Sequence, residues 1–247
     1  MKKKFLRNKE IISFVIPCYN CERFIERNIK KLINKLKNYK IKYEIILVND
    51  SSKDNTKKIL NKLKFSYNKL KVFNNKTNKG KSYSLIYGIK KTKGRKIIIY
   101  DCDLPYFKFL DKVIKKVFLY QLVLIDRRHK KSKLIVNKLS IYQILRFLIG
   151  HLIYLINSFF INIKTKDTQS GLKGFEKPKN FNKIKFISKR FFFDLELLII
   201  FQKKKIYPYS IPVKFEIPSN SNIKIFDLKK NIEIINELTK IIKKYKN

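Results

Sequence analysis

The sequence predicts an α/β fold in which a doubly wound parallel sheet is flanked by helices. Apolar segments of strand length alternate along the chain with segments of helical periodicity. The strand segments are continuously apolar, as strands buried on both faces are, and the turns between them are short. Together these observations are typical of a parallel sheet with helices on both faces.

Four strands are expected in the first part of the chain, at 11–17, 43–50, 69–75 and 96–103. The first, "IISFVIP", is apolar nearly throughout and is closed by Pro17. "YEIILVND" and "KIIIYDCD" are apolar up to acidic ends, and "KLKVFNN" is weaker. Helices are expected between the strands, at 22–37, 51–63 and 80–92. Ser51, Ser52 or Asp54 can cap the second helix.

The chain is long enough for one sizeable domain. Its 247 residues are 45% hydrophobic, which is sufficient for a core. It has no Ser/Gly-rich or Pro-rich linker and no repeat of solenoid length. We therefore expect a single domain over residues 1–247.

The charge of the chain is strongly basic, with 59 Lys and Arg against 18 Asp and Glu and a net charge of +41. Such a charge favours nucleic acid or an anionic membrane surface as a partner. The Lys runs are spread along the chain, and no aromatic RNA-binding motif or zinc-finger spacing accompanies them. A general abundance of Lys on the outer faces of all the helices would give the same charge, so nucleic acid is disfavoured, and an anionic membrane surface is kept as an expected partner.

The three cysteines, Cys18, Cys21 and Cys102, form no disulfide framework, and their odd count suits a reducing compartment. The C-x-x-C of Cys18 and Cys21 has no second pair or nearby His, so we interpret it as structural. The N-terminus passes directly into a strand pattern without an apolar signal region. These features predict a cytoplasmic protein.

Polar side chains follow three of the predicted strands where each strand ends. Tyr19 and Asn20 follow the first, Asn49 and Asp50 end the second, and Asp101 and Asp103 end the fourth. The carboxyl ends of parallel strands meet at one edge of a sheet, where ligands bind. Two carboxylates one residue apart repel each other unless a cation lies between them, so the sequence predicts a divalent metal here.

An ordered set of motifs over residues 11–230 resembles the inverting glycosyltransferases of family 2, which have the GT-A fold. In the first half these are "FVIPCYN", "ILVNDSSKDNT", "NKGKSYSLIYGIKKTKG" and the D-x-D "DCD". In the second half, "DRRH", "DTQSGLKGF", "FFFDLELL" and "IPVKFEIPSNS" resemble dolichyl- and polyprenyl-phosphate sugar synthases, above all the dolichyl-phosphate glucosyltransferase branch. The resemblance implies a Rossmann-like, doubly wound and mostly parallel sheet.

The resemblance also implies a nucleotide-sugar donor, UDP-glucose or GDP-mannose, bound by the first-half motifs. Asp103 would ligate Mg²⁺ or Mn²⁺, and Asp101 would contact the metal, its shell or the ribose. The metal would neutralise the charge that grows on the departing diphosphate. The other donor-binding residues implied are Pro17, Tyr19, Asn20, Asp50 and Lys81.

The second-half motifs imply a polyprenyl or dolichyl phosphate as acceptor of a hexose, glucose or mannose. Asp167 would be a base or a sugar-positioning group, and Arg127 would bind the phosphate of the acceptor. The other acceptor-binding residues implied are Arg146, Thr168, Gln169, Ser170 and Asp194. A phosphomonoester has a second pKa of about 6 and is already a nucleophile at neutral pH, so it hardly needs a base.

Residues 140–163 form a long apolar segment with helical spacing. The length suits a transmembrane helix, but polar residues gather on one strip, which favours an amphipathic helix in the membrane interface. In the family resembled, this position holds a membrane-facing helix. Residues 228–246 predict a second amphipathic helix. We therefore expect peripheral association with the cytoplasmic face of a membrane, with a core helix at 140–163 as the alternative.

Two other functions are compatible with the sequence. A family-2 transferase acting on a hydroxyl of a glycolipid or soluble glycan would need a true base, such as Asp167 or Asp194. A basic nucleic-acid-binding protein would depend on neither Asp101 nor Asp103.

Overall fold

The computed structural model describes residues 10–39, 41–136, 140–217 and 228–246. Within these ranges, the side chains of residues 142, 146, 147, 149, 153 and 228–231 lie outside the description.

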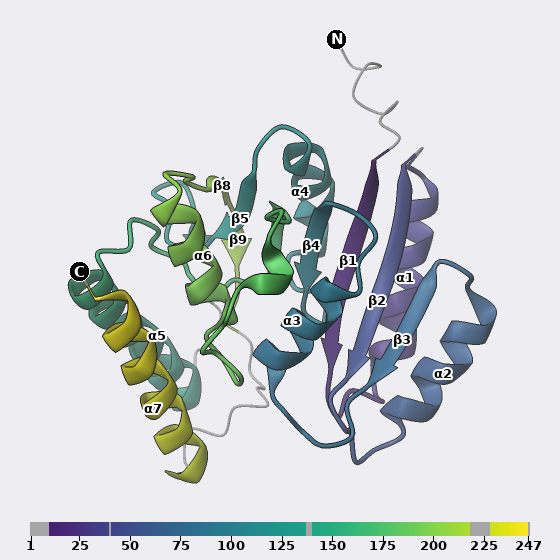
Figure 1. Ribbon diagram of the computed structural model, residues 1–247, viewed down its shortest axis with the longest axis horizontal. Helices are drawn as coiled ribbons and strands as arrows, with labels where there is room; N and C mark the ends of the chain where they lie inside the picture. The colour runs from purple at the N-terminus through teal and green to yellow at the C-terminus, as the bar shows by residue number, and fades with distance from the viewer. Residues whose placement is uncertain (1–9, 40, 137–139, 218–227, 247) are drawn as a thin grey trace.

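A seven-stranded sheet forms the centre of the fold, in the order β3-β2-β1-β4-β7-β5-β8 (Figure 1). Its strands are β1 (Ile11–Cys18), β2 (Lys42–Asn49), β3 (Leu70–Asn74), β4 (Lys96–Tyr100), β5 (Leu122–Asp126), β7 (Leu172–Glu176) and β8 (Tyr209–Pro212). β7 is antiparallel to β4 and β5, and the other neighbours are parallel. A small second sheet pairs β6 (Lys133–Leu134) with β9 (Lys214–Phe215). The predicted mostly parallel, doubly wound sheet is confirmed.

Helices cover both faces of the sheet (Figure 1). One face carries α1 (Ile25–Lys37), α2 (Thr56–Ser66) and α4 (Leu110–Val117). The other carries α3 (Lys81–Lys90) and α6 (Phe193–Lys203). Two longer helices, α5 (Ile141–Ile161) and α7 (Leu228–Tyr245), contact each other beside α6.

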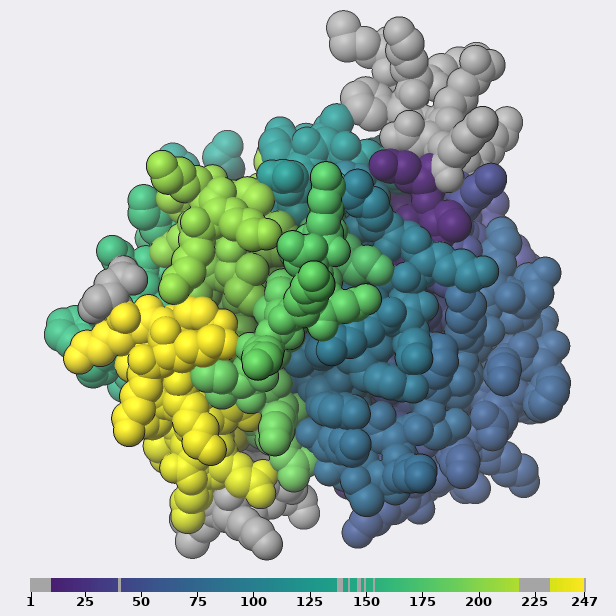
Figure 2. Space-filling view, viewed as in Figure 1, coloured from purple at the N-terminus to yellow at the C-terminus, as the bar shows by residue number. Residues whose placement is uncertain are grey.

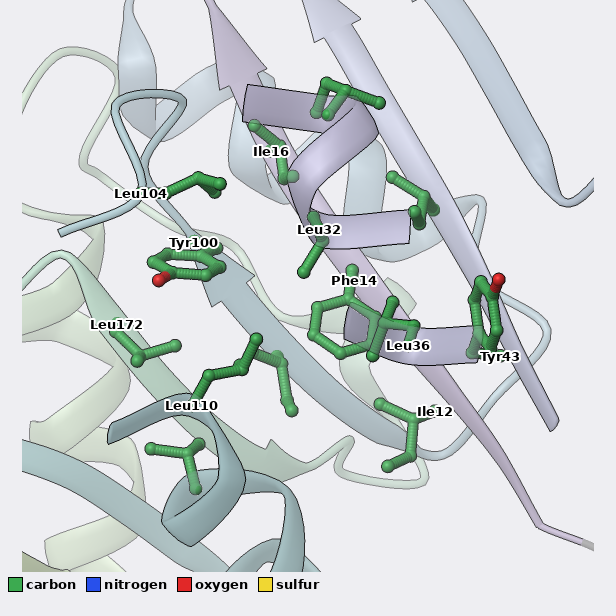
Figure 3. Close-up of a cluster of buried hydrophobic side chains, with 14 of the residues drawn as sticks. Ile12, Phe14, Ile16, Leu32, Leu36, Tyr43, Tyr100, Leu104, Leu110 and Leu172 are labelled. Atoms are coloured by element: carbon green, nitrogen blue, oxygen red, sulfur yellow. The ribbon is translucent and has the colours of Figure 1, made fainter. Parts of the chain in front are cut away.

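The alternation of side chains along β1 divides the core into two clusters. Phe14 and its neighbours Ile12 and Ile16 point toward α1, where they meet Leu32 (Figure 3). Val15 belongs to the cluster on the α3 side. Each of these side chains is fully buried, which stabilises the fold by about 1.5–3 kcal/mol per residue. Cys18 and Cys21 are also buried in the first cluster, as a structural role requires.

The predicted elements of the first half differ from the observed ones mainly at their ends. β4 ends at Tyr100, so the D-x-D lies beyond the strand and not within it. α2 begins at Thr56, whose backbone N–H donates to Asp54 Oδ1 (3.0 Å), whereas Ser51 and Ser52 do not cap it. β5 to β9 are additions to the four predicted strands. β7 was hidden because its five residues include Lys173 and Gly174, which interrupt the apolar pattern.

Candidate active site

The turns that follow β1 and β2 are joined to each other at the carboxyl ends of the strands. The backbone N–H of Asn20 donates to Ser52 Oγ (3.1 Å), and Asn20 Oδ1 accepts from the N–H of Lys53 (2.9 Å). Asn20 has a φ of 47°, in the left-handed region that Asn tolerates. Pro17 and Tyr19 are half-buried beside it. Because β1 lies between β2 and β4, these turns share an edge with the D-x-D.

Asp50 organises the loop between β3 and α3. Its side chain is buried, and Oδ1 accepts from Asn75 Nδ2 (2.7 Å) and from the N–H of Lys79 (2.9 Å). Oδ2 accepts from the N–H of Gly80 (2.7 Å). Gly80 has a φ of 98°, which favours glycine. Asp50 therefore fixes residues 75–80, because both of its carboxylate oxygens accept hydrogen bonds from them.

The D-x-D lies where β4 meets the turn before β7. The backbone N–H of Asp101 donates to Gly171 O (2.9 Å), and Asp101 Oδ1 pairs with Lys81 Nζ (2.6 Å). Asp103 is exposed. Burial opposes the charge of Lys81, but Asp101 and Asp194 raise its pKa above the ordinary value, so it is a permanent cation. Asp101, Asp103 and Lys81 thus lie close enough together for their charges to interact.

The D-x-D fits a divalent metal only if a ligand completes the coordination. The described residues contain no group of three or more His, Cys, Asp or Glu that would hold a metal ion by itself. Mg²⁺ and Mn²⁺ are commonly held by one or two carboxylates together with substrate phosphates. Asp101 and Asp103 provide such a pair of hard oxygen ligands. They would hold the metal jointly with the diphosphate of a donor.

Arg127, which follows β5, and the buried Asp167 form a two-pronged ion pair. Arg127 donates from Nε to Oδ2 and from Nη2 to Oδ1, both at 2.7 Å, and its backbone N–H donates to Oδ2 (2.9 Å). Burial opposes ionisation of Asp167, but these bonds lower its pKa below the ordinary value. Asp167 is therefore a weak base that orients Arg127, whose side chain stays one-third exposed.

A second ion pair lies beneath the "DTQSG" turn. Lys173 is fully buried, and its Nζ contacts Asp194 Oδ1 (3.0 Å) and Ser170 O (2.5 Å). Asp194 therefore has its carboxylate paired with a lysine. Ser170 Oγ is buried and has no hydrogen-bond partner among the described residues. Sequence reasoning missed Lys173, although a lysine within a buried strand signals a partnered charge.

Arg128, in the turn that follows β5, contacts α5. Its Nη1 lies 2.9 Å from His151 Nδ1, and its guanidinium lies 5.0 Å from the ring centroid of Tyr154. Of the other predicted acceptor residues, Thr168 is buried and Gln169 is exposed. Arg146 lies on α5, and its side chain is outside the described residues. His151 was not predicted, because nothing in its sequence neighbourhood indicates a contact with Arg128.

The fold and the residues gathered at its strand ends are those of a nucleotide-sugar transferase. The family model of glycosyl transferase family 2 matches residues 13–186. The chain belongs to that family and is a nucleotide-sugar-dependent glycosyltransferase.

Its relatives include dolichyl-phosphate beta-glucosyltransferases. One from Trichomonas vaginalis is 28% identical over 239 residues, covering 91% of this chain and 71% of the relative. The enzyme of that name from Homo sapiens is 28% identical over 214 residues, covering 79% of this chain and 64% of the relative. The resemblance to this branch of the family is confirmed.

Solved structures of related fold support the GT-A architecture. Glucosyl-3-phosphoglycerate synthase from Mycobacterium tuberculosis, in complex with Mn²⁺, UDP and phosphoglyceric acid, has a TM-score of 0.66 at 17% identity, covering 95% of this chain and 79% of that one. Mannosyl-3-phosphoglycerate synthase from Rubrobacter xylanophilus has a TM-score of 0.66 at 14% identity, covering 95% and 74%. At these identities the likeness shows the fold alone.

Mn²⁺ and a nucleoside diphosphate are expected to bind cooperatively at the D-x-D. Because two carboxylates leave most of the coordination shell to the ligand, Mn²⁺ alone should bind weakly, and UDP should bind much more tightly with Mn²⁺ than without it. In Asp103→Asn, the factor by which Mn²⁺ increases the affinity for UDP should fall about tenfold or more, which corresponds to about 1.4 kcal/mol of binding free energy for each tenfold. Titration calorimetry measures both affinities. Glu26→Gln, which removes a carboxylate that pairs with Lys30 on α1, is the control, and an equal gain from Mn²⁺ in both variants would refute the assignment.

The pair of Asp167 and Arg127 should give the fold a defined acid sensitivity. Because folding lowers the pKa of Asp167, its stabilising effect is complete above the unfolded value of about 3.9 and is lost as the pH falls through the folded value. Asp167→Asn should lower the free energy of unfolding at pH 7 by about 1–2 kcal/mol, since Arg127 is partly exposed. The difference from wild type should shrink below about pH 4. Urea unfolding across pH measures it, and a pH-independent difference would contradict the pairing.

Proposed function

We propose that this protein transfers a hexose from a nucleotide sugar to a polyprenyl or dolichyl phosphate at the cytoplasmic face of a membrane. The names of its relatives support glucose, and hence UDP-glucose, ahead of mannose and GDP-mannose. Mg²⁺ or Mn²⁺ bound at the D-x-D would neutralise the negative charge that grows on the departing diphosphate. Lys81 adds a fixed positive charge beside Asp101, where the diphosphate would lie.

The two hydrogen bonds from the Arg127 guanidinium to Asp167 are the observation that favours a phosphate acceptor. A hydroxyl acceptor needs a base to take its proton. Asp167 has both oxygens on Arg127 and a lowered pKa, and Asp194 is paired with the buried Lys173. A phosphate brings its own negative oxygen, so it needs a cation to hold it in place. The partly exposed Arg127 provides that cation.

The outer face of α5 supports an acceptor carried in a membrane. Its large apolar side chains are exposed at Ile141, Ile144, Leu145, Leu148, Leu152, Leu155, Phe159 and Phe160. The stretch Gln143–Ile161 is long and apolar enough to cross a membrane by length and composition alone, and 14% of it is buried. The contact of Arg128 with His151 and Tyr154 links α5 to the turn after β5, which also carries Arg127. An interfacial position of α5 would bring a lipid phosphate directly to Arg127.

The acceptor is tested by comparing a polyprenyl phosphate with the matching polyprenol. With UDP-glucose as donor, transfer to the phosphate should exceed transfer to the alcohol. Arg127→Lys keeps the charge beside Asp167 but loses the two-pronged geometry, so kcat/KM for the phosphate acceptor should fall about tenfold. The KM for UDP-glucose should stay near its wild-type value. Equal transfer to the polyprenol would promote the hydroxyl-acceptor alternative.

Binding to membranes should depend on the exposed leucines of α5. Replacing Leu148, Leu152 and Leu155 by Ser should weaken flotation with anionic vesicles even at low salt, because each buried leucine contributes up to about 1.5–3 kcal/mol. Leu119→Ser is the matched control, since this leucine is 50% exposed outside α5. Wild-type protein that does not float, or triple-variant protein that floats equally well, would overturn the interfacial position.

A further inference from the structure

The segment of residues 187–192 lies against the start of α3 (Figure 2). The first amides of α3 donate to this segment, Ser82 N to Arg190 O (3.1 Å) and Tyr83 N to Lys189 O (2.8 Å). A Cβ on Gly80 would lie 2.6 Å from Lys189 O, so the two backbones are in direct contact. The segment therefore supplies acceptors that the first turn of a helix lacks within itself.

Hydroxyl groups add a second connection at the same place. Ser82 Oγ and Ser188 Oγ share a hydrogen bond (2.8 Å), and Ser82 Oγ also accepts from the N–H of Phe193 (3.0 Å). Ser82 and Ser188 are almost completely buried. Because buried polar groups are costly to separate from their partners, any shift of the segment would carry the start of α3 with it.

The segment is held from its other side by α7. Glu237 is buried, and its carboxylate accepts from the N–H groups of Arg190 (3.0 Å), Phe192 (3.2 Å) and Phe191 (3.3 Å), as well as from Ser188 Oγ. One turn earlier, Glu233 Oε2 lies 3.2 Å from Arg190 Nε. Figure 2 shows the segment in green between α7 in yellow and α3 in blue.

The connection ends at the D-x-D. Lys81 is the first residue of α3, and its Nζ lies 2.6 Å from Asp101 Oδ1. Arg190 Nη1 also donates to Asn78 Oδ1 (2.6 Å), and Asn78 Nδ2 donates to Asp50 O (3.2 Å). The segment thus contacts both the helix start that carries Lys81 and the loop that Asp50 shapes.

We infer that Glu237 is a positioning residue for the donor site. By anchoring residues 187–192 it fixes the start of α3 and holds the Lys81 ammonium against Asp101. The C-terminal helix, which lies outside every motif that carries the family resemblance, thereby sets the geometry of the donor cation. This inference rests on the proposed donor site at Lys81 and the D-x-D.

The test compares Glu237→Ala and Glu237→Gln with Asn236→Ala, an exposed neighbour on the same helix. In the full chain, Glu237→Ala should lower the affinity for UDP with Mn²⁺ about tenfold, within the range for residues that share a hydrogen-bond network. Glu237→Gln, which retains one carbonyl acceptor, should fall between it and wild type. Asn236→Ala should match wild type, and kcat at saturating donor should change little in all three.

Amide hydrogen exchange separates positioning from a merely structural role. The amides of Ser82 and Tyr83 should exchange faster in Glu237→Ala, whereas those of β1 residues 14–16 should not. Faster exchange throughout the chain, or unchanged exchange at Ser82 and Tyr83, would overturn the inference. The exchange experiment uses no substrate, so it stands even if the proposed sugar or acceptor is wrong. If Glu237→Ala does not fold, the same comparison with Glu237→Gln decides the matter.

Discussion

Pairing of charges at the sheet edge is the constraint on which the structure depends. Three acidic residues each meet a cation from another segment, as Asp101 with Lys81, Asp194 with Lys173 and Asp167 with Arg127. Asp167, Asp194 and Lys173 are almost completely buried, and a buried charge without a partner is strongly destabilising, so α6 and the loops around β5 and β7 must pack correctly for these pairs to form. Basic residues far outnumber acidic ones in this chain. The position of each of these carboxylates therefore determines which of the many cations is held at the sheet edge.

The antiparallel strand β7 brings the two halves of the site into contact. Gly171, just before β7, accepts the backbone N–H of Asp101, and a Cβ on it would lie 2.5 Å from Asp101 Oδ2. On the other side of this turn, Asp167 orients Arg127. The turn therefore contacts both Asp101, at the proposed donor site, and Arg127, at the proposed acceptor site. This arrangement suits a reaction in which one phosphate group leaves while another attacks, and in which the protein contributes orientation and charge.

The sequence predicts the first half of the fold better than the second, for a physical reason. β1, β2 and β4 are buried on both faces and so are continuously apolar, which makes them visible as strands. β7 contains a buried lysine whose partner, Asp194, is distant in sequence, and no local pattern reveals that pair. The family resemblance pointed to Asp167 as a site residue. Its ion pair with Arg127 could not be predicted, because the two residues are 40 positions apart and meet only in the folded chain. Glu237 was missed because it serves backbone amides, which leave no sequence signature.

The dependence of the transfer rate on pH tests most directly the claim that the acceptor, and not the protein, provides the nucleophilic charge. The rate at saturating UDP-glucose would be measured with a polyprenyl phosphate and with a polyprenyl difluoromethylphosphonate, whose second pKa is lower. The account predicts an acid limb centred near the second pKa of the phosphate, about 6, that shifts to lower pH with the phosphonate. An acid limb at the same pH for both acceptors would assign the titrating group to the protein and contradict the account.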